Sequence, residues 1–417
     1  MVDVWIPYGR TEVCVRVPTK RYIGEIKPKK AEKPANVDEE IARGLKNPVG
    51  SRSLKETSEG RRSASIAVDP FIRPDLCERI LLPLISELID YGMVKSEISI
   101  IMGSGLRPLG KEVLRQFSEE LRSLVSIHDC RDENHEYVGK TKHGTDVYVN
   151  RVFLDSDLKV ILSKVSLHPF EGFSGGRDMI LPGIAGEKSV RRNRALLLRS
   201  GAQPGMLDGN PVHEDMTEAA EMVGIDYCIN VFLDDRGDLI KVFSGGLKES
   251  FEEAVGFVRE HTVVKVSERA DVAVVGMGGY PVDSKLSDVI EALMYASGAV
   301  KRKGTIIAVA ECAEGYGDET FYRWMTKFDS LNQIKRAIKM HFEYGGEKAY
   351  YLLKLKEQLS LKLVSAIPRF YSDNVFRLET YRAVNEALAE ALREEGKGAK
   401  VSVIPEGLST LPVFKGG

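Results

Sequence analysis

SLHPFEGFSGGRDMILPGIAG, residues 166–186, is the densest run of glycine and polar residues in the chain, and it follows an apolar run at residues 158–163. An apolar run that leads into glycines is typical of a buried strand ending at a binding loop. The turn residues are Gly172, Ser174, Gly175 and Gly176. Backbone N–H groups there, together with Arg177, suit a carboxylate or phosphate. A plain glycine turn whose arginine caps a helix is equally compatible with the segment.

His168 lies just past the predicted strand, where open α/β sheets place their ligands. An imidazole at such a place is a candidate general acid or base, or a metal ligand. A structural histidine is the alternative, and the residue by itself does not decide between them.

Strand and helix patterns alternate on both sides of this segment. Strands are predicted at residues 64–68, 98–102, 147–150, 158–163, 270–275, 304–309 and 401–404. Helices are predicted at residues 76–91, 109–125, 247–260, 288–300 and 374–395. The alternation predicts an α/β fold of two domains, each with a mostly parallel sheet flanked by helices and with a ligand cleft between them.

The domain boundary is predicted near residue 268, giving domains 1–268 and 269–417, with a return of the C-terminal tail to the first domain left open. Alternating apolar residues before and after residues 8–10 predict an N-terminal hairpin in the first domain. A Lys- and Pro-rich connection follows at residues 25–60, with one short helix near residues 39–45.

The composition excludes several classes of protein. The 417 residues carry a formal net charge of -2, which argues against a dedicated nucleic-acid binder. Five dispersed cysteines without a CxxC pair indicate free thiols in a reducing compartment. No signal peptide or membrane span is predicted, so a cytoplasmic protein with a small-molecule ligand is expected. Self-association is left open.

Further candidate residues follow other predicted strands. Arg73 and Arg107 come after the first two strands, and both could bind an anion. In the second domain, Gly279 and Tyr280 follow one strand and Glu311 follows the next. We expect these side chains to line one ligand site.

The order of these segments resembles that of the nickel-dependent lactate racemase family, the nickel-pincer-nucleotide enzymes, from about residue 4 to residue 412. The matching strings are PYG at residues 7–9, SGGR at 174–177, LPGIAG at 181–186, GNPVHEDM at 209–216, GYPVD at 279–283 and AEC at 310–312. The resemblance implies racemisation or epimerisation of 2-hydroxy acids. It also implies a nickel cofactor tethered through a lysine, a histidine that binds the nickel, two acid/base histidines, and a lysine and an arginine that hold the substrate carboxylate.

This chain departs from that pattern at four main functional positions, and also at Asp288 and Pro70, where the resemblance implies a glutamine and an acid. Asp178 stands where the resemblance implies the tether lysine, and Arg194, which follows Asn193, stands where it implies the nickel-binding histidine. Leu106 replaces an acid/base histidine, and Glu291 replaces the substrate lysine. The chain therefore resembles a divergent member that lacks the cofactor tether.

Of the functional positions that the resemblance implies, Arg73 and His168 are retained. One hypothesis is an isomerase that uses His168, Arg73 and Arg177, with altered or absent nickel-pincer chemistry or with another divalent metal. A second is a carboxylate- or phosphate-binding module without catalysis. A third is ordinary racemase activity with Lys164 or Lys188 as the tether. The sequence leaves the cofactor unknown.

Overall fold

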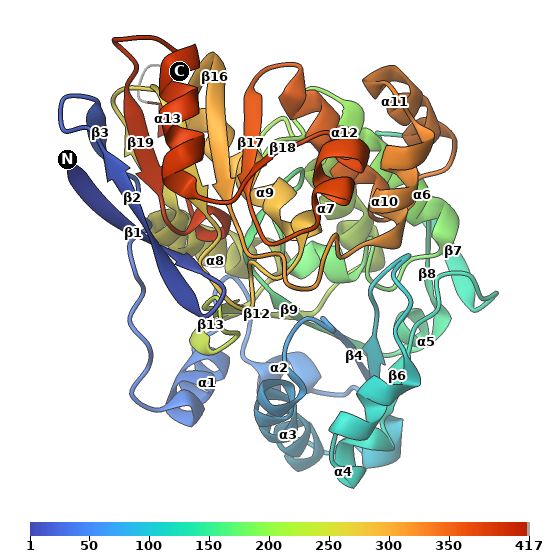
Figure 1. Cartoon of the computed structure of the whole chain (residues 1–417). Coiled ribbons are helices and arrows are strands. Elements are labelled where there is room, and N and C mark those ends of the chain that lie inside the picture. The colour runs from blue at the N-terminus through green and yellow to red at the C-terminus, as the bar shows by residue number, and fades with distance from the viewer. Residues whose placement is uncertain (415–417) are drawn as a thin grey trace. The chain divides into compact units, whose positions relative to one another are not determined.

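The structure, a computed structural model, describes residues 1–414. It contains two compact units (Figure 1). Residues 31–259 form one, here called the central unit, and residues 1–30 with the chain from residue 260 onward form the other, the terminal unit. The described residues include no helix that is long and apolar enough to cross a membrane.

The central unit is built on a six-stranded sheet with the order β13-β12-β9-β4-β5-β6 (Figure 1). All neighbours run parallel except β12 and β13. The strands are β4 (Ala64–Val68), β5 (Ile98–Met102), β6 (Val125–Ile127), β9 (Leu158–Lys164), β12 (Tyr227–Leu233) and β13 (Leu239–Gly245). The helices are α1 (Val37–Lys46), α2 (Leu54–Ser58), α3 (Pro74–Asp90), α4 (Glu119–Arg122), α5 (Arg151–Asp155), α6 (Glu187–Ala195), α7 (Pro211–Val223) and most of α8 (Leu247–Thr262).

Helix α3 shows why this unit folds as it does. Its apolar residues Leu76, Ile80, Leu84 and Leu88 repeat every four positions, so they share one face, and all are buried in the core beside the sheet. Strand β4 is buried along its whole length, as expected for an inner strand of a covered parallel sheet.

The terminal unit has a second six-stranded sheet, with the order β18-β17-β16-β15-β19-β3 and every neighbouring pair parallel. Its strands are β3 (Tyr22–Glu25), β15 (Ala270–Gly276), β16 (Val300–Val309), β17 (Ser360–Val364), β18 (Glu379–Tyr381) and β19 (Val401–Ile404). Smaller sheets pair β1 (Val2–Tyr8) with β2 (Thr11–Val17), and β14 (Val263–Val266) with β20 (Leu411–Phe414). The helices are α9 (Leu286–Ala296), α10 (Glu319–Lys327), α11 (Leu331–Met340), α12 (Gly346–Lys356) and α13 (Val384–Glu394).

The predicted α/β fold with two parallel-sheet cores is confirmed, but the chain is partitioned differently from the predicted 1–268 and 269–417. The division falls at residues 259/260, and residues 1–30 belong to the terminal unit. The cause is packing: the N-terminal hairpin contributes Val4, Ile6, Val15 and Val17 to the core that contains Val272, and β3 pairs with β19.

Two predicted helices are wrong in extent. Residues 109–125 form a 3₁₀ turn at Lys111–Gln116 and the short α4, because Phe117 between them is extended and buries its ring in the core. In residues 374–395, only α13 is a regular helix, since β18 joins the sheet first. The predicted strand at 147–150 exists as β8 (Asp146–Asn150), but it pairs with β7 (His135–Lys140) in a separate hairpin.

Candidate functional site

The central sheet reverses its strand order between β4 and β9, because β5 and β6 extend it on one side of β4 and β9 and β12 extend it on the other. Ligands in open α/β sheets bind beyond the carboxyl ends of the strands at such a point. Asp69 follows β4 there. Its two carboxylate oxygens accept hydrogen bonds from the backbone N–H groups of Phe71 (2.8 Å) and Lys164 (3.1 Å). Burial raises the pKa of Asp69 above its ordinary value.

His168, on the short strand β10 (Leu167–His168) beyond β9, is held by Glu171. The Glu171 backbone N–H donates to His168 Nδ1 (3.2 Å), so the neutral ring carries its hydrogen on Nε2. Glu171 Oε1 lies 3.7 Å from Nε2. The edge of the ring also meets Phe170, with the centroids 4.5 Å apart. The His168 side chain is a quarter exposed, so it is both oriented and accessible.

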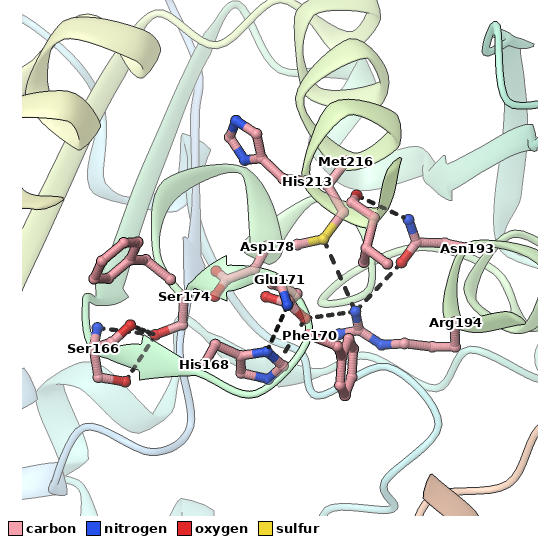
Figure 2. A network of polar contacts seen from close by, with 12 residues as sticks. Ser166, His168, Phe170, Glu171, Ser174, Asp178, Asn193, Arg194, His213 and Met216 are labelled. Carbon is pink, nitrogen blue, oxygen red and sulfur yellow. Dashed lines mark hydrogen bonds and ion pairs between the residues drawn. The ribbon is translucent and has the colours of Figure 1, made fainter. Parts of the chain in front are cut away.

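Arg194 on α6 forms a buried ion pair with Glu171 (Figure 2). Its Nη1 lies 2.5 Å from Glu171 Oε1, and both side chains are less than 5% exposed. The guanidinium also lies over the Phe170 ring, 5.2 Å from its centroid. Burial alone would raise the pKa of Glu171, but Arg194, His168 and Arg177 together lower it below its ordinary value. Arg194 therefore serves as the counter-charge of a buried carboxylate.

The glycine turn between Ser174 and Asp178 is fixed by hydrogen bonds. Ser174 Oγ bonds to the Ser166 hydroxyl (2.9 Å), and the Gly176 N–H donates to Ser163 Oγ (2.6 Å). The buried Arg177 donates from Nη1 and Nη2 to the carbonyls of Gly175 and Phe173. Since these terminal nitrogens are used within the turn, Arg177 mainly holds the loop in shape.

Asp178 belongs to the same turn, on the 3₁₀ helix η3 (Gly176–Met179). Its Oδ2 accepts the Gly175 N–H (2.7 Å), whereas Oδ1 is buried and has no hydrogen-bond partner among residues 1–414. Burial, reinforced by the nearby carboxyl groups of Glu171 and Asp69, raises the pKa of Asp178 to about 8. The group is therefore largely protonated at neutral pH.

The other predicted residues of the central unit follow strands β4 and β5. Arg73 begins α3 and pairs with Asp75 and Asp238, both at 3.1 Å. Arg107 is exposed and lies over the Phe71 ring. Leu106 is buried, 5% exposed.

In the terminal unit, Gly279 and Glu311 gather around Gly9 and Asp283. Asp283 is fully buried, and its Oδ2 accepts the N–H groups of Gly9 (2.6 Å) and Glu311 (3.3 Å). Gly9 and Gly279 have φ of +54° and +82°, and a Cβ on Gly9 would collide with the Glu311 carboxylate. Tyr280 donates its N–H to the Gly9 carbonyl (2.7 Å) but exposes its ring.

Glu291 on α9 pairs with Lys348 on α12. The Lys348 side chain is 8% exposed, so this ammonium is held within the unit. An amine from a different helix therefore lies beside the position where the family resemblance implies a lysine.

The sequence did not single out Glu171 or Lys348, the partners of Arg194 and Glu291. Glu171 stands three residues after His168, a spacing that could have marked it. Lys348 carries no local signal, because its partner is 57 residues away. The described residues contain no group of three or more His, Cys, Asp or Glu side chains arranged to hold a metal ion.

Comparison with known proteins adds an independent finding. The family model of the lactate racemase N-terminal domain matches residues 8–205, and that of the lactate racemase C-terminal domain matches residues 265–412. Lactate racemases from Thermoanaerobacterium thermosaccharolyticum and Lactiplantibacillus plantarum are 29% and 27% identical to the chain. The matches cover 99% of this chain in both cases, and 99% and 100% of the two relatives.

Comparison with solved structures also finds a lactate racemase. The lactate racemase apoprotein from T. thermosaccharolyticum superposes with a TM-score of 0.87 at 27% identity, over 99% of this chain and all of that one. A crystal structure of a Thermotoga maritima protein shares the fold, with a TM-score of 0.64 at 18% identity over 93% of this chain and all of that one.

Proposed function

Because the chain belongs to the lactate racemase family, we propose that it is an isomerase that racemises or epimerises a 2-hydroxy acid or a sugar acid, with altered or absent nickel-pincer chemistry. The observation that carries this proposal is His168 at the point where the central sheet reverses its strand order, oriented by Glu171 and partly exposed. His168 would exchange a proton with the ligand, and Glu171 would stabilise the imidazolium.

The side chains at the cofactor positions do not suit a lysine-tethered nickel nucleotide. The carboxyl group of Asp178 cannot form a linkage derived from an amine. The guanidinium of Arg194 stays protonated and is committed to Glu171, so it is a poor nickel ligand. No step is therefore assigned to that cofactor.

Binding of the ligand carboxylate is assigned to cations near the carboxyl ends of β4, β5 and β9. Arg73 must leave Asp75 and Asp238 to take part, and the exposed Arg107 lies over the Phe71 ring. Lys164, at the end of β9, makes no side-chain hydrogen bond or ion pair within residues 1–414. Within the terminal unit, Gly279, Tyr280 and Glu311 stay proposed ligand-binding residues of that unit.

The proposal is tested by incubating the purified protein with D-lactate, L-lactate and a panel of sugar acids in D₂O, with and without added Ni²⁺, Mg²⁺ or Mn²⁺. We expect interconversion of one substrate pair, with deuterium entering at the inverted carbon because a proton is exchanged with solvent. His168→Ala should reduce the rate about 10²–10⁴-fold. Intact mass should equal that of the unmodified chain.

Each part of the proposal can fail separately. A covalent mass increment that is lost in Lys164→Ala or Lys188→Ala would restore the nickel-pincer chemistry on another lysine. Inversion without deuterium incorporation would indicate hydride transfer. Absence of turnover over the whole panel, with every metal, would exclude the isomerase.

A carboxylate- or phosphate-binding module without catalysis is the second candidate. Two of the four substituted positions favour it, because the side chains of Arg194 and Glu291 are engaged in ion pairs. Calorimetry with lactate and with phosphate tests this candidate. A binding module would bind one of these anions without turnover, and a protein that bound neither would contradict it.

A further inference from the structure

The terminal unit contains an open cavity of about 510 Å³ that none of the candidate residues above lines. Its walls are residues 313–317, Glu319, Pro368 and Tyr371. The first two groups follow β16 and the last two follow β17, which is the parallel neighbour of β16. The cavity therefore lies beyond the carboxyl ends of two adjacent strands, the edge at which open α/β sheets bind their ligands.

Backbone hydrogen bonds fix the walls of this cavity. The Glu311 carbonyl, just before the first wall, accepts the N–H of Ala366 beyond β17 (3.0 Å). The Tyr316 carbonyl accepts the N–H of Ser287 in the first turn of α9 (3.2 Å). The first wall is thus tied both to the second wall and to a helix, so the shape of the cavity is determined by the fold.

Two tyrosine rings form part of the lining. The ring centroids of Tyr316 and Tyr371 lie 5.5 Å apart, and the ring planes make an angle of 55°. Tyr322 on α10 does not line the cavity, but its ring stacks on that of Tyr316 at 4.9 Å and supports it. Tyr371 belongs to a short π-helix, Phe370–Val375, a rare conformation that is frequent at functional sites. A ligand in the cavity therefore meets aromatic carbon as well as polar groups.

The charged side chains of the lining are acidic. They are Glu314 and Glu319, and no lysine, arginine or histidine of the described chain lines the cavity. Glu314 pairs with Lys285 (3.4 Å), whereas Glu319 forms no ion pair with residues 1–414. The Tyr316 hydroxyl donates to Glu319 Oε1 (2.6 Å) and leaves Oε2 for a ligand. This hydrogen bond raises the pKa of Tyr316 to about 12, so the hydroxyl keeps its proton.

The positive groups around the cavity are engaged elsewhere. Arg369, beside Pro368, donates to the Thr380 carbonyl on β18 (3.2 Å). The amino end of α10 carries about half a positive charge, and the Asp318 carboxylate caps it by accepting the Phe321 N–H (2.8 Å). Among the described residues, the lining therefore keeps a carboxylate without a counter-charge, which favours a positively charged ligand over a carboxylate or a phosphate.

We propose that this cavity binds an organic cation, whose ammonium or guanidinium group pairs with Glu319 and lies against the rings of Tyr316 and Tyr371. Aromatic rings attract such cations through the negative charge of their faces. A bare metal ion would lack ligands, because the described residues contain no group of three or more acidic, histidine or cysteine side chains arranged to hold one. The inference does not rest on the proposed isomerase, whose residues do not line this cavity.

The test is an NMR titration of the full chain with two cations, each compared with a neutral molecule of the same shape. Choline is compared with 3,3-dimethylbutan-1-ol, and N-acetyl-L-argininamide with N-acetyl-L-citrullinamide. We expect at least one cation to bind about 10-fold more tightly than its neutral counterpart, with an upfield shift of the ligand protons that lie over the rings. Tighter binding of choline indicates a free ammonium compound, and tighter binding of the arginine derivative indicates a side chain of a peptide or protein.

Variants inside and beside the cavity locate the site of binding. Glu319→Gln and Tyr371→Leu should each weaken binding of the cation about 3- to 30-fold. Asp373→Asn and Phe370→Leu are the matched controls, because these exposed side chains lie within two residues of Tyr371 but do not line the cavity. Both controls should bind the cation like the wild type. Thermal unfolding checks that each variant is folded.

Three results would overturn the inference. In the first, neither cation binds more tightly than its neutral counterpart. In the second, Glu319→Gln binds the cation as tightly as the wild type does. In the third, the two control variants lose as much affinity as the two cavity variants. These measurements need no turnover, so a missing cation site leaves the proposed isomerase untouched, and a missing isomerase activity leaves the cation site untouched.

Discussion

Arg194 and Glu171 form a pair whose members depend on each other. Both side chains are buried, so removing the cation leaves an uncompensated carboxylate. We expect Arg194→Ala to lower the free energy of unfolding by about 3–5 kcal/mol. Arg194→Met combined with Glu171→Gln should cost markedly less, because no unpaired charge remains. Urea denaturation measures both, and equal losses in the two variants would contradict the role assigned to the pair.

Asp178 should give stability an unusual dependence on pH. Its pKa is about 8 in the folded protein and close to 4 in an unfolded chain, so between these values the folded state binds one more proton. Stability contributed by this group therefore falls as pH rises from 4 to 8, by up to about 1.4 kcal/mol per pH unit. The stability of Asp178→Asn lacks this dependence on pH. Urea denaturation should therefore show that the free energy of unfolding of Asp178→Asn, relative to that of the wild type, is higher at pH 8 than at pH 5. The same change of unfolding free energy with pH in the wild type and in Asp178→Asn would exclude a raised pKa of Asp178.

The sequence located some single residues of the candidate site but could not identify their partners. His168 and the SGGR turn lie beyond a strand end as predicted, since local pattern determines where a strand stops. The Arg194–Glu171 and Lys348–Glu291 pairs join different elements, so local pattern contains no information about them. The side chain of Arg177 was expected to bind an anion, yet it bonds to carbonyls of its own turn.

At the scale of elements, the turn before η3 depends on glycine. Gly175 has φ of +117°, and a methyl group there would collide with Val165. Gly175→Ala should therefore cost about 1–3 kcal/mol and disturb the position of Asp178. Gly256 on α8 is the matched control, because a Cβ there meets no atom within 4 Å. Gly256→Ala should stabilise the helix by about 0.5–1 kcal/mol, and thermal unfolding of both variants checks the contrast.

Elements with a strong period were predictable, and those set by tertiary contacts were not. Helix α3 and strands β4, β5 and β9 lie close to their predicted positions. The break at Phe117 required knowledge of the core into which its ring inserts. The pairing of β8 with β7 could not be predicted from the sequence either, because a single alternating segment does not specify its partner strand.

For the whole molecule, the partition of the chain predicts which fragments can fold. Residues 31–259 form a continuous unit with its own core, so this fragment should fold alone. Residues 260–417 should not, because the hairpin of β1 and β2 completes their core and β3 extends their sheet. Adding residues 1–30 as a separate peptide should restore folding. Circular dichroism and NMR dispersion test this, and a cooperatively folded 260–417 fragment would contradict it.

The pairing of β3 with β19 has a consequence for synthesis on the ribosome. Tyr22 pairs with Val401, so the N-terminal strand waits for about 380 further residues before its partner is made. At about 5–20 residues per second, that interval is roughly 20–75 s. During this time the central unit can fold, whereas β3 lacks its partner strand and the β1–β2 hairpin lacks the core that buries its apolar residues. A nascent chain of this design would benefit from a chaperone that shields its N-terminus until translation ends.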